Sequence, residues 1–285
     1  MANTFTAACV QTTAGPDMDA NIRAASDLVR RARDAGADFI ALPENVALMH
    51  PDPKAVKSHA LPRDENPAVD AFRALAREVG TWLLAGSLPV RSPDGRIANC
   101  SMVMDPDGAI VASYDKIHMF DVDLANGESY RESRSFQPGG EAVLAPLPWG
   151  VLGLSVCYDL RFPHLYRTLA QAGADFLTIP AAFTKTTGEA HWHVLQRARA
   201  IENGCFVIAP CQCGLHYGDR RTFGHSLIVD PWGVVLADGG EAPGFVVAEI
   251  DPARVAEVRA MIPSLGHDRP FKAPKAAKPR ISAVS

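Results

Sequence analysis

The chain has 285 residues, of which 47% are apolar and 21% are charged, and its formal net charge is −4. This composition excludes a fully disordered chain, and the length allows one large domain or two small ones. The lack of a basic excess argues against a nucleic-acid-binding protein. No apolar run is long enough to span a bilayer, so we expect no contact with a membrane. The first residues lack a basic start followed by an apolar stretch, so we expect no secretory signal.

Short apolar runs alternate along the chain with amphipathic stretches, as in an α/β protein. The apolar runs are continuous, which is expected of strands that are covered on both faces. In chain order, the predicted strands are Phe5–Val10, Asp38–Leu42, Thr81–Leu88, Ile97–Met104, Ile110–Tyr114, Val151–Val156, Phe176–Ile179, Cys205–Ala209, Ser226–Val229, Val234–Ala237 and Phe245–Ile250. The predicted helices are Asn21–Ala35, Ala68–Val79, Pro163–Gln171, Ala190–Glu202 and Pro252–Met261.

Two segments of the first half return in the second half in the same order. Residues 34–43 read DAGADFIALP and residues 171–180 read QAGADFLTIP. Residues 101–108 read SMVMDPDG and residues 226–233 read SLIVDPWG. The matches indicate one structural unit used twice, and the alternative is chance reuse of a helix–glycine–strand pattern. We predict a single domain over residues 1–266, with a mixed sheet in each half, helices outside and the two sheets face to face.

The last segment, residues 267–285, has a different composition. It carries five basic residues and three prolines, and no acidic residue follows Asp268. This composition predicts an extended basic tail. Two interpretations stay open: a frayed end, or an arm that packs on a partner subunit.

Six cysteines are too few for a disulfide framework in a chain of this size, so we expect reduced thiols in the cytoplasm. Cys157 stands out because it ends an apolar run and precedes a predicted helix. A nucleophile at such a strand-to-helix turn projects from the carboxyl edge of the sheet, and the helix N-terminus stabilises a thiolate. The alternative is a buried structural cysteine.

Two further ionisable residues also follow predicted strands. Glu44 closes the apolar run before it, where a carboxylate is costly unless it is solvated or paired. Lys116 follows the strand Ile110–Tyr114. The alternatives are a surface glutamate and a solvated lysine. The long loop over residues 120–141 holds Glu128 and Glu132, either of which could fold back over a pocket.

A cysteine, a lysine and a glutamate together can hydrolyse an amide. Glu44 would take the thiol proton of Cys157, and the thiolate would attack the amide carbonyl. Lys116 and the backbone N–H of Tyr158 would stabilise the oxyanion. The protonated Glu44 would then protonate the leaving amine and activate water against the thioester.

These segments resemble the nitrilase superfamily of carbon–nitrogen hydrolases, whose pattern is a Glu–Lys–Cys triad. The carrying motifs are Leu-Pro-Glu44-Asn, Tyr-Asp-Lys116-Ile-His and Val-Cys157-Tyr-Asp-Leu-Arg-Phe-Pro, and the resemblance covers about residues 5 to 265. It implies a four-layer α-β-β-α sandwich, a homodimer or homotetramer, and no metal or organic cofactor. It also implies a second glutamate that orients the lysine, and Glu132, in Glu-Ser-x4-Pro-Gly, fits that motif better than Glu128.

Within the superfamily the chain is similar to the branch of amidases that act on deaminated glutathione. The most specific stretch is Cys-Gln-Cys-Gly-Leu-His over residues 211–216. The resemblance implies a small amide substrate that carries a 2-oxo acid carboxylate, with Arg161, the Phe183 backbone and Thr187 in its binding site. An arginine can bind a carboxylate through two hydrogen bonds. The alternative for Arg161 is a salt bridge to Asp159 or to another buried acid.

The sequence therefore predicts a cytoplasmic cysteine amidase that splits deaminated glutathione into 2-oxoglutarate and cysteinylglycine. The enzymatic alternatives are an omega-amidase acting on 2-oxoglutaramate and an N-carbamoyl amino-acid hydrolase. A catalytically idle scaffold on the same fold is a non-enzymatic alternative. A thiol–disulfide or metal protein centred on Cys211 and Cys213, with His216 nearby, is a further one, although the Cys-x-Cys spacing is not typical of zinc sites.

Overall fold

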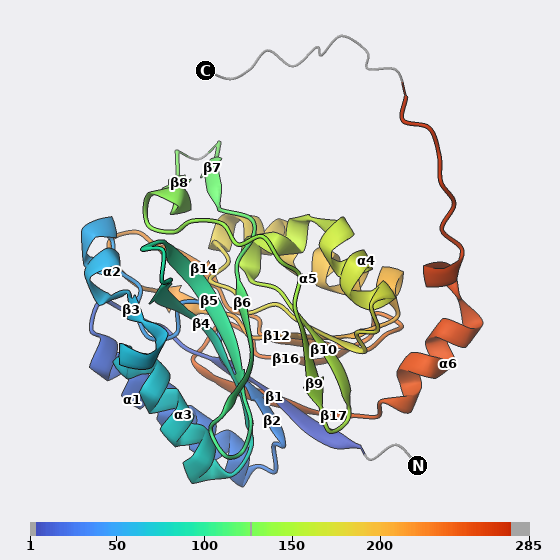
Figure 1. Cartoon of the computed structure of the whole chain (residues 1–285), viewed down its shortest axis with the longest axis horizontal. Coiled ribbons are helices and arrows are strands. Elements are labelled where there is room, and N and C mark those ends of the chain that lie inside the picture. The colour runs from blue at the N-terminus through green and yellow to red at the C-terminus, as the bar shows by residue number, and fades with distance from the viewer. Residues whose placement is uncertain (1–3, 126, 275–285) are drawn as a thin grey trace.

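Two face-to-face β-sheets between two layers of helices make up the fold in the computed structural model, which describes residues 4–125 and 127–274 (Figure 1). The order in the first sheet is β17 (Gly244–Ile250), β1 (Phe5–Gln11), β2 (Phe39–Ala41), β4 (Trp82–Arg91), β5 (Ile97–Met104) and β6 (Ile110–Asp115), with β3 (Leu61–Pro62) beside β4. The order in the second sheet is β16 (Val235–Asp238), β15 (Leu227–Val229), β12 (Phe206–Ala209), β11 (Phe176–Thr178), β10 (Gly150–Leu154) and β9 (Leu144–Leu147).

The helices lie outside the sheets. Figure 1 shows α1 (Met18–Asp34) and α3 (Pro67–Val79) over the first sheet, and α4 (Pro163–Gln171) and α5 (Lys185–Asn203) over the second. The short α2 (Pro53–His59) lies near β3, and α6 (Ala253–Met261) follows β17. The predicted α-β-β-α sandwich with two mixed sheets is confirmed. No helix in the described ranges is both long and apolar enough to cross a membrane.

The two sheets repeat one pattern of strand pairing. In the first sheet β1, β2 and β4 are parallel neighbours, and β5 and β6 continue antiparallel. In the second sheet β10, β11 and β12 are parallel, and β15 and β16 continue antiparallel. The internal sequence matches make β2 equivalent to β11, and the end of β5 equivalent to β15. These strands hold corresponding places in the two sheets, as expected if one structural unit is used twice.

Side chains along each strand point alternately to its two faces, which divides the core into a part between the sheets and a part under the helices. In β1, Ala7 and Cys9 pack in the core between the sheets, whereas Ala8 and Val10 pack against the outer helices with Val29 of α1. Both faces of the strand are therefore buried, as the continuous apolar runs predict.

Most predicted elements match the structure, with differences at their ends. The helix expected to begin at Ala190 begins at Lys185, because the Thr184 hydroxyl caps it by accepting from the Thr187 N–H. The strand expected to end at Leu88 runs on to Arg91. Besides short 3-10 helices, the elements with no counterpart in the prediction are α2, β3, β9, the hairpin of β7 (Asp121–Asp123) and β8 (Ser129–Arg131), and that of β13 (Cys213–Leu215) and β14 (Arg221–Phe223).

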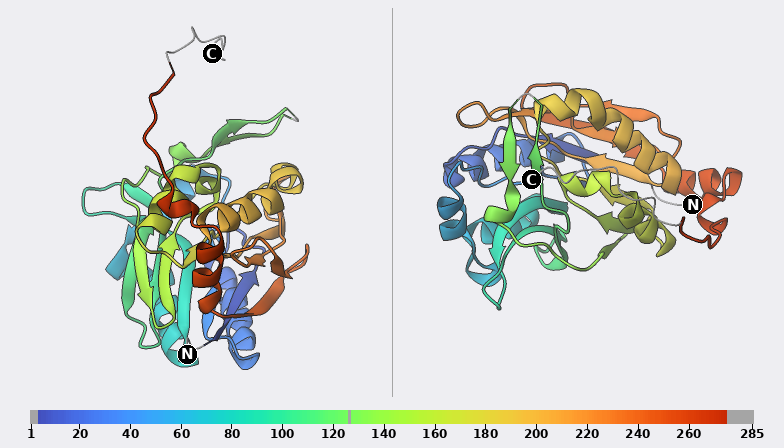
Figure 2. Two further views of the ribbon diagram at one scale, coloured as in Figure 1. Left: turned by 90° about the vertical axis from the view of Figure 1, so that its right-hand side faces the viewer. Right: turned by 90° about the horizontal axis from the view of Figure 1, so that it is seen from above.

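The loop expected over residues 120–141 thus contains a short hairpin, which projects from the body of the molecule in Figure 2. Residues 267–274 form neither helix nor strand and lead away from the body. Near their start, Asp268 pairs with Arg167 of α4. The remainder of the predicted tail, residues 275–285, lies outside the described residues.

Candidate active site

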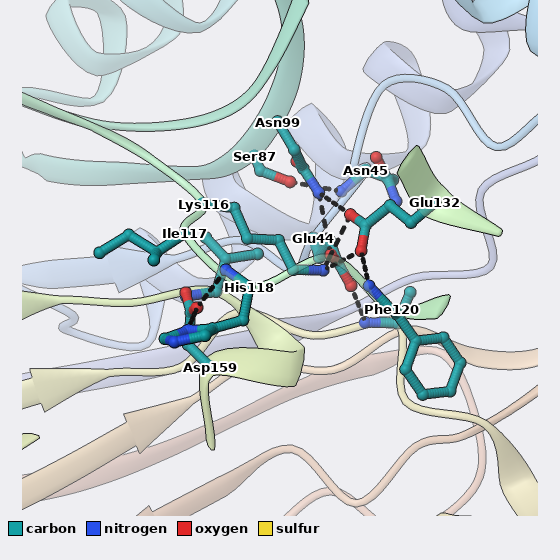
Figure 3. Close-up of polar contacts among 12 residues, drawn as sticks. Glu44, Asn45, Ser87, Asn99, Lys116, Ile117, His118, Phe120, Glu132 and Asp159 are labelled. Atoms are coloured by element: carbon teal, nitrogen blue, oxygen red, sulfur yellow. Dashed lines mark hydrogen bonds and ion pairs between the residues drawn. The ribbon is translucent and has the colours of Figure 1, made fainter. Parts of the chain in front are cut away.

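The residues singled out from the sequence meet at one edge of the sandwich. Glu44 follows β2, Lys116 directly follows β6, and Cys157 lies just beyond β10. Glu132 opens a short 3-10 helix directly after β8. Although they are far apart in the chain, Figure 3 shows Glu44, Lys116 and Glu132 pointing toward one another.

Two glycines allow the backbone to bring these turns together. A side chain at Gly86 in β4 would lie 2.0 Å from the carbonyl oxygen of Leu42, just before Glu44. A side chain at Gly139 would lie 2.2 Å from the carbonyl oxygen of Asp115, just before Lys116. Both distances are shorter than van der Waals contact, so only glycine permits these approaches.

The Lys116 ammonium forms an ion cluster with two carboxylates. Its Nζ lies 2.8 Å from Oε1 of Glu44, and 2.9 and 2.8 Å from Oε1 and Oε2 of Glu132. The Lys116 side chain is only 1% exposed and that of Glu44 is 4% exposed. Because water barely reaches them, the charges interact strongly and hold one another in place.

Neighbouring N–H groups complete this cluster. The side-chain amide of Asn99 donates to Oε1 of both glutamates, at 3.0 Å in each case. The backbone N–H of Ala182 donates to Oε2 of Glu44 at 2.8 Å, and that of Phe120 donates to Oε2 of Glu132 at 2.7 Å. Each of the four carboxylate oxygens therefore has a donor, and both side chains are fixed in orientation.

Cys157 occupies a strained turn between β10 and the 3-10 helix Cys157–Arg161. Its φ of 50° lies in the left-handed region that non-glycine residues rarely adopt. Its N–H donates to the carbonyl of Pro180 at 2.9 Å, and Asp159 braces the turn by accepting from the Val156 N–H. Among the described residues no acceptor is found for the N–H of Tyr158, the second residue of this short helix. That N–H is free to bind an oxyanion.

Electrostatics set the protonation states of the resting site. Burial raises the pKa of the Glu44 carboxyl, but the Lys116 ammonium and the hydrogen bond from the Cys157 thiol outweigh it, so the pKa lies below its ordinary value. Burial and the Glu44 carboxylate raise the pKa of the Cys157 thiol well above its usual range. At neutral pH the site thus pairs a neutral thiol with an ionised carboxylate that can accept its proton.

The pKa values of Lys116 and Glu132 are also shifted by burial and by neighbouring charges. Burial lowers the pKa of Lys116, but the carboxylates of Glu132 and Glu44 outweigh burial and hold the pKa well above its ordinary value. Burial, aided by repulsion from Glu44, raises the pKa of Glu132 above its ordinary value against the attraction of Lys116. Lys116 is therefore a permanent cation in this site.

The two candidate second glutamates have different surroundings. Glu132 contacts Lys116, as described above. Glu128 lies at the end of the β7–β8 hairpin, where it accepts from the Thr186 hydroxyl at 2.8 Å and from the Tyr130 hydroxyl. The geometry therefore places Glu132, and not Glu128, beside the lysine.

A cavity of about 540 Å³ opens beside Cys157, Glu44 and Lys116. Of the residues predicted to bind substrate, Tyr158, Phe183 and Thr187 line it. Arg161 does not, because its guanidinium packs over the rings of Phe183 and Tyr158, at 5.2 and 5.9 Å from their centroids. It also contacts Nδ1 of His191 at 3.3 Å. Arg161 therefore lies behind the cavity wall rather than in it.

The expected alternative partner of Arg161, Asp159, is occupied elsewhere. Its carboxylate is fully buried and accepts from the Tyr114 hydroxyl at 2.7 Å and from the His118 N–H at 3.0 Å. It also contacts Nδ1 of His118 at 2.7 Å (Figure 3). Asp159 thus ties the turn after β10 to the segment after Lys116.

Asn99, Asp159 and Arg220 were not found as site residues from the sequence. Asn99 interrupts an apolar strand and Asp159 lies two residues after Cys157, so each had a weak local signal. Arg220, in the turn between β13 and β14, lines the cavity but had none. Apart from the Val156 N–H, which donates to Asp159, the partners that hold these three side chains are distant in the chain.

Among the described residues, Cys211 and Cys213 are not joined by a disulfide, and they do not gather with His216 into a group of metal ligands. All six cysteines are free and buried. Both ring nitrogens of His216 contact protein oxygens, at 2.7 Å from the carbonyl of Ala14 and 2.6 Å from the hydroxyl of Thr222. Within the described ranges, the residues whose ligand atoms gather as a metal would need are His193, His225 and Asp238, which lie elsewhere.

Comparison with known proteins agrees with this geometry. The model of the family described as carbon-nitrogen hydrolase matches residues 6–260. The chain belongs to the carbon–nitrogen hydrolase family. It is 42% identical to the deaminated glutathione amidase of Synechocystis over 268 residues, which cover 92% of this chain and 97% of that protein.

Two further relatives extend the likeness. The deaminated glutathione amidase of Homo sapiens is 42% identical, with 92% of this chain and 82% of that protein covered. The crystal structure of the Caenorhabditis elegans NitFhit protein superposes with a TM-score of 0.87 at 36% identity, covering 94% of this chain and 66% of that longer chain. The chain is therefore a carbon–nitrogen hydrolase.

Proposed function

We propose that this enzyme is a cysteine amidase that hydrolyses deaminated glutathione to 2-oxoglutarate and cysteinylglycine through a thioester at Cys157. The observation that carries the proposal is the grouping of the Cys157 thiol, the ionised Glu44 carboxylate and the Lys116 ammonium on one open cavity. The names of the Synechocystis and human relatives support the choice of substrate.

In the acylation step Glu44 accepts the proton of Cys157 while the sulfur attacks the amide carbonyl carbon. The carbonyl oxygen becomes an oxyanion, which the Lys116 ammonium and the Tyr158 N–H stabilise. Each such donor contributes about 3–4 kcal/mol to the transition state in comparable sites. The C–N bond then breaks, Glu44 gives its proton to the leaving nitrogen, and a thioester remains.

Deacylation repeats the same proton transfers with water. Glu44 takes a proton from a water molecule, whose oxygen attacks the thioester carbonyl. The C–S bond breaks, the thiolate regains its proton from Glu44, and 2-oxoglutarate leaves. Glu132 is the positioning residue in this scheme, because its carboxylate holds Lys116 without contacting Cys157.

The 2-oxo acid carboxylate of the substrate needs donors and positive charge. We assign it to the Thr187 hydroxyl and the Phe183 backbone, which line the cavity, with Arg161 behind them supplying the charge. The reaction proposed above uses protein groups and one water molecule, with no metal ion or organic cofactor.

The assembly and the location belong to the same proposal. Val194 and Ile201, seven residues apart on α5, are 67% and 51% exposed, so this face can bury apolar area against a second copy. We therefore propose a cytoplasmic homodimer or homotetramer whose domain spans residues 1–266, with residues 267–285 as its tail. Light scattering after size exclusion gives the mass of the assembly.

The test measures 2-oxoglutarate released from deaminated glutathione and from 2-oxoglutaramate by the wild type, Cys157→Ala and Cys213→Ala. We expect a higher kcat/KM for deaminated glutathione. The Cys157→Ala change should lower it at least about 10³-fold, and Cys213→Ala, outside the cavity, should leave it intact. A preference for 2-oxoglutaramate would instead make the protein an omega-amidase. Inactivity on both substrates would refute the proposal and direct attention to N-carbamoyl amino acids.

A further inference from the structure

The proposed substrate carries a carboxylate on each side of its scissile amide. One belongs to the 2-oxo acid, and the other ends the cysteinylglycine leaving group. Two extended residues place that second carboxylate about 7 Å beyond the scissile nitrogen. The residues assigned so far account for only the first carboxylate, so the cavity needs a second anion site.

Arg220 has the features of such a site. It lines the cavity, and its Nη1 is buried and has no hydrogen-bond partner among the described residues. Its Nη2 donates to the carbonyl of Ala182 at 2.9 Å, and its guanidinium stacks over the Tyr130 ring at 4.4 Å from the centroid. A buried guanidinium nitrogen without an acceptor is costly, so the position favours an anionic ligand.

Of the other cavity cations, Lys116 and Arg131 already have carboxylate partners, and Arg134 is exposed to solvent. Lys116 is held by two glutamates, and Arg131 binds both carboxylate oxygens of Asp123, at 2.8 and 2.7 Å. No ion pair within the described ranges involves Arg220. Its charge is therefore available to a ligand.

The position of Arg220 matches the side from which the amine leaves. Glu44 must face the leaving nitrogen in order to protonate it, and its Oε2 accepts from the N–H of Ala182. Arg220 holds the carbonyl of this same residue. The segment that leads to Arg220 begins at Gln212, whose side chain donates to the Glu44 carbonyl at 3.0 Å. Arg220 is thus attached to the Glu44 side of the cavity, whereas Arg161 belongs to the turn that carries Cys157.

We propose that Arg220 binds the terminal carboxylate of the leaving dipeptide and so selects peptide-type amides over simple ω-amides. This inference rests on the proposed function. The leaving group of 2-oxoglutaramate is ammonia, which cannot reach Arg220. Arg220 should therefore affect turnover of deaminated glutathione and not that of 2-oxoglutaramate.

The experiment compares Arg220→Met with the wild type on both substrates, with Arg221→Met as a matched control. Arg221 is the next residue, exposed and outside the cavity lining. We expect Arg220→Met to lower kcat/KM for deaminated glutathione about 10- to 100-fold, the usual effect of losing a hydrogen bond to a charged group. Turnover of 2-oxoglutaramate should change less than about threefold, which also reports that the variant is folded. Arg221→Met should change neither.

A modified substrate tests whether Arg220 contacts the glycine carboxylate. For the wild type, amidating the glycine carboxylate of deaminated glutathione should lower kcat/KM as much as the Arg220→Met change does with the normal substrate. Using the amidated substrate with Arg220→Met should lower kcat/KM little further. Equal losses on both substrates would overturn the inference by showing a structural role or binding of the 2-oxo acid carboxylate. No loss with either change would overturn it as well. A wild type inactive on deaminated glutathione refutes the proposed function itself, and the inference with it.

Discussion

Replacing Lys116 by methionine removes the cation that Glu44 and Glu132 both contact, and leaves two buried carboxylates facing each other. Removing one partner of a buried ion pair costs about 3–5 kcal/mol. With about 2–4 °C of Tm per kcal/mol, the variant should melt roughly 6–20 °C below the wild type at pH 7. It should also lose at least about 10²-fold in kcat, because an oxyanion donor is gone.

The pH dependence of this loss has a definite sign. Without the ammonium, burial and mutual repulsion raise the pKa of both carboxyl groups in the folded variant above their unfolded values. The folded state then binds more protons than the unfolded state, so the deficit in stability shrinks as the pH falls from 7 toward 5. Thermal unfolding followed by circular dichroism at both pH values measures the change.

A second substitution tests the cause directly. Lys116→Met combined with Glu132→Gln leaves one carboxylate in the cluster, so the double variant should be more stable than Lys116→Met alone while remaining inactive. The Glu132→Gln single variant is the control for the effect of the amide. A double variant no more stable than Lys116→Met would refute the reasoning that charge repulsion dominates.

Three further outcomes follow from the geometry. Iodoacetamide should alkylate Cys157 well before the other five thiols, because it lines the cavity, and peptide mapping should find the adduct there; equal, slow labelling of all six would favour an idle scaffold. Asn99→Leu should keep the fold but lower kcat about 10-fold, because both glutamates lose a donor; unchanged kinetics would show that the ion cluster needs no bridge. Burial lowers the pKa of His216 from 6.5 to about 4, so the folded state resists protonation that the unfolded state accepts. Stability should fall by about 3 kcal/mol as the pH drops from 6.5 to 4, and urea unfolding of His216→Gln should show a shallower fall; parallel pH profiles would contradict this.

Most of the site could be predicted from residues that directly follow predicted strands. Glu44, Lys116 and Cys157 each follow an apolar run, so local pattern placed them at sheet edges, and the two-fold repeat placed those edges together. Glu132 lacks such a signal, because it follows a strand of three residues in a polar loop. Only the family motif distinguished it from Glu128.

Long-range contacts explain what was missed. The partners of Asn99 lie 55 and 33 residues away along the chain, and those of Arg220 come from the segment after β11 and from the β7–β8 hairpin. Neither set has a periodicity that a local pattern can reveal. Arg161 shows the converse: the motif around it suggested a role in the cavity, but stacking on Phe183 and Tyr158 places its guanidinium behind the wall.

The central claim is that Cys157 carries the acyl group during turnover. The most direct measurement is peptide mapping by mass spectrometry of enzyme quenched in acid while it hydrolyses deaminated glutathione, with Cys157→Ala protein treated in parallel. The mechanism predicts a 2-oxoglutaryl group on the peptide that contains Cys157, and none on the variant. An acyl group on another residue, or turnover by the Cys157→Ala variant, would contradict it.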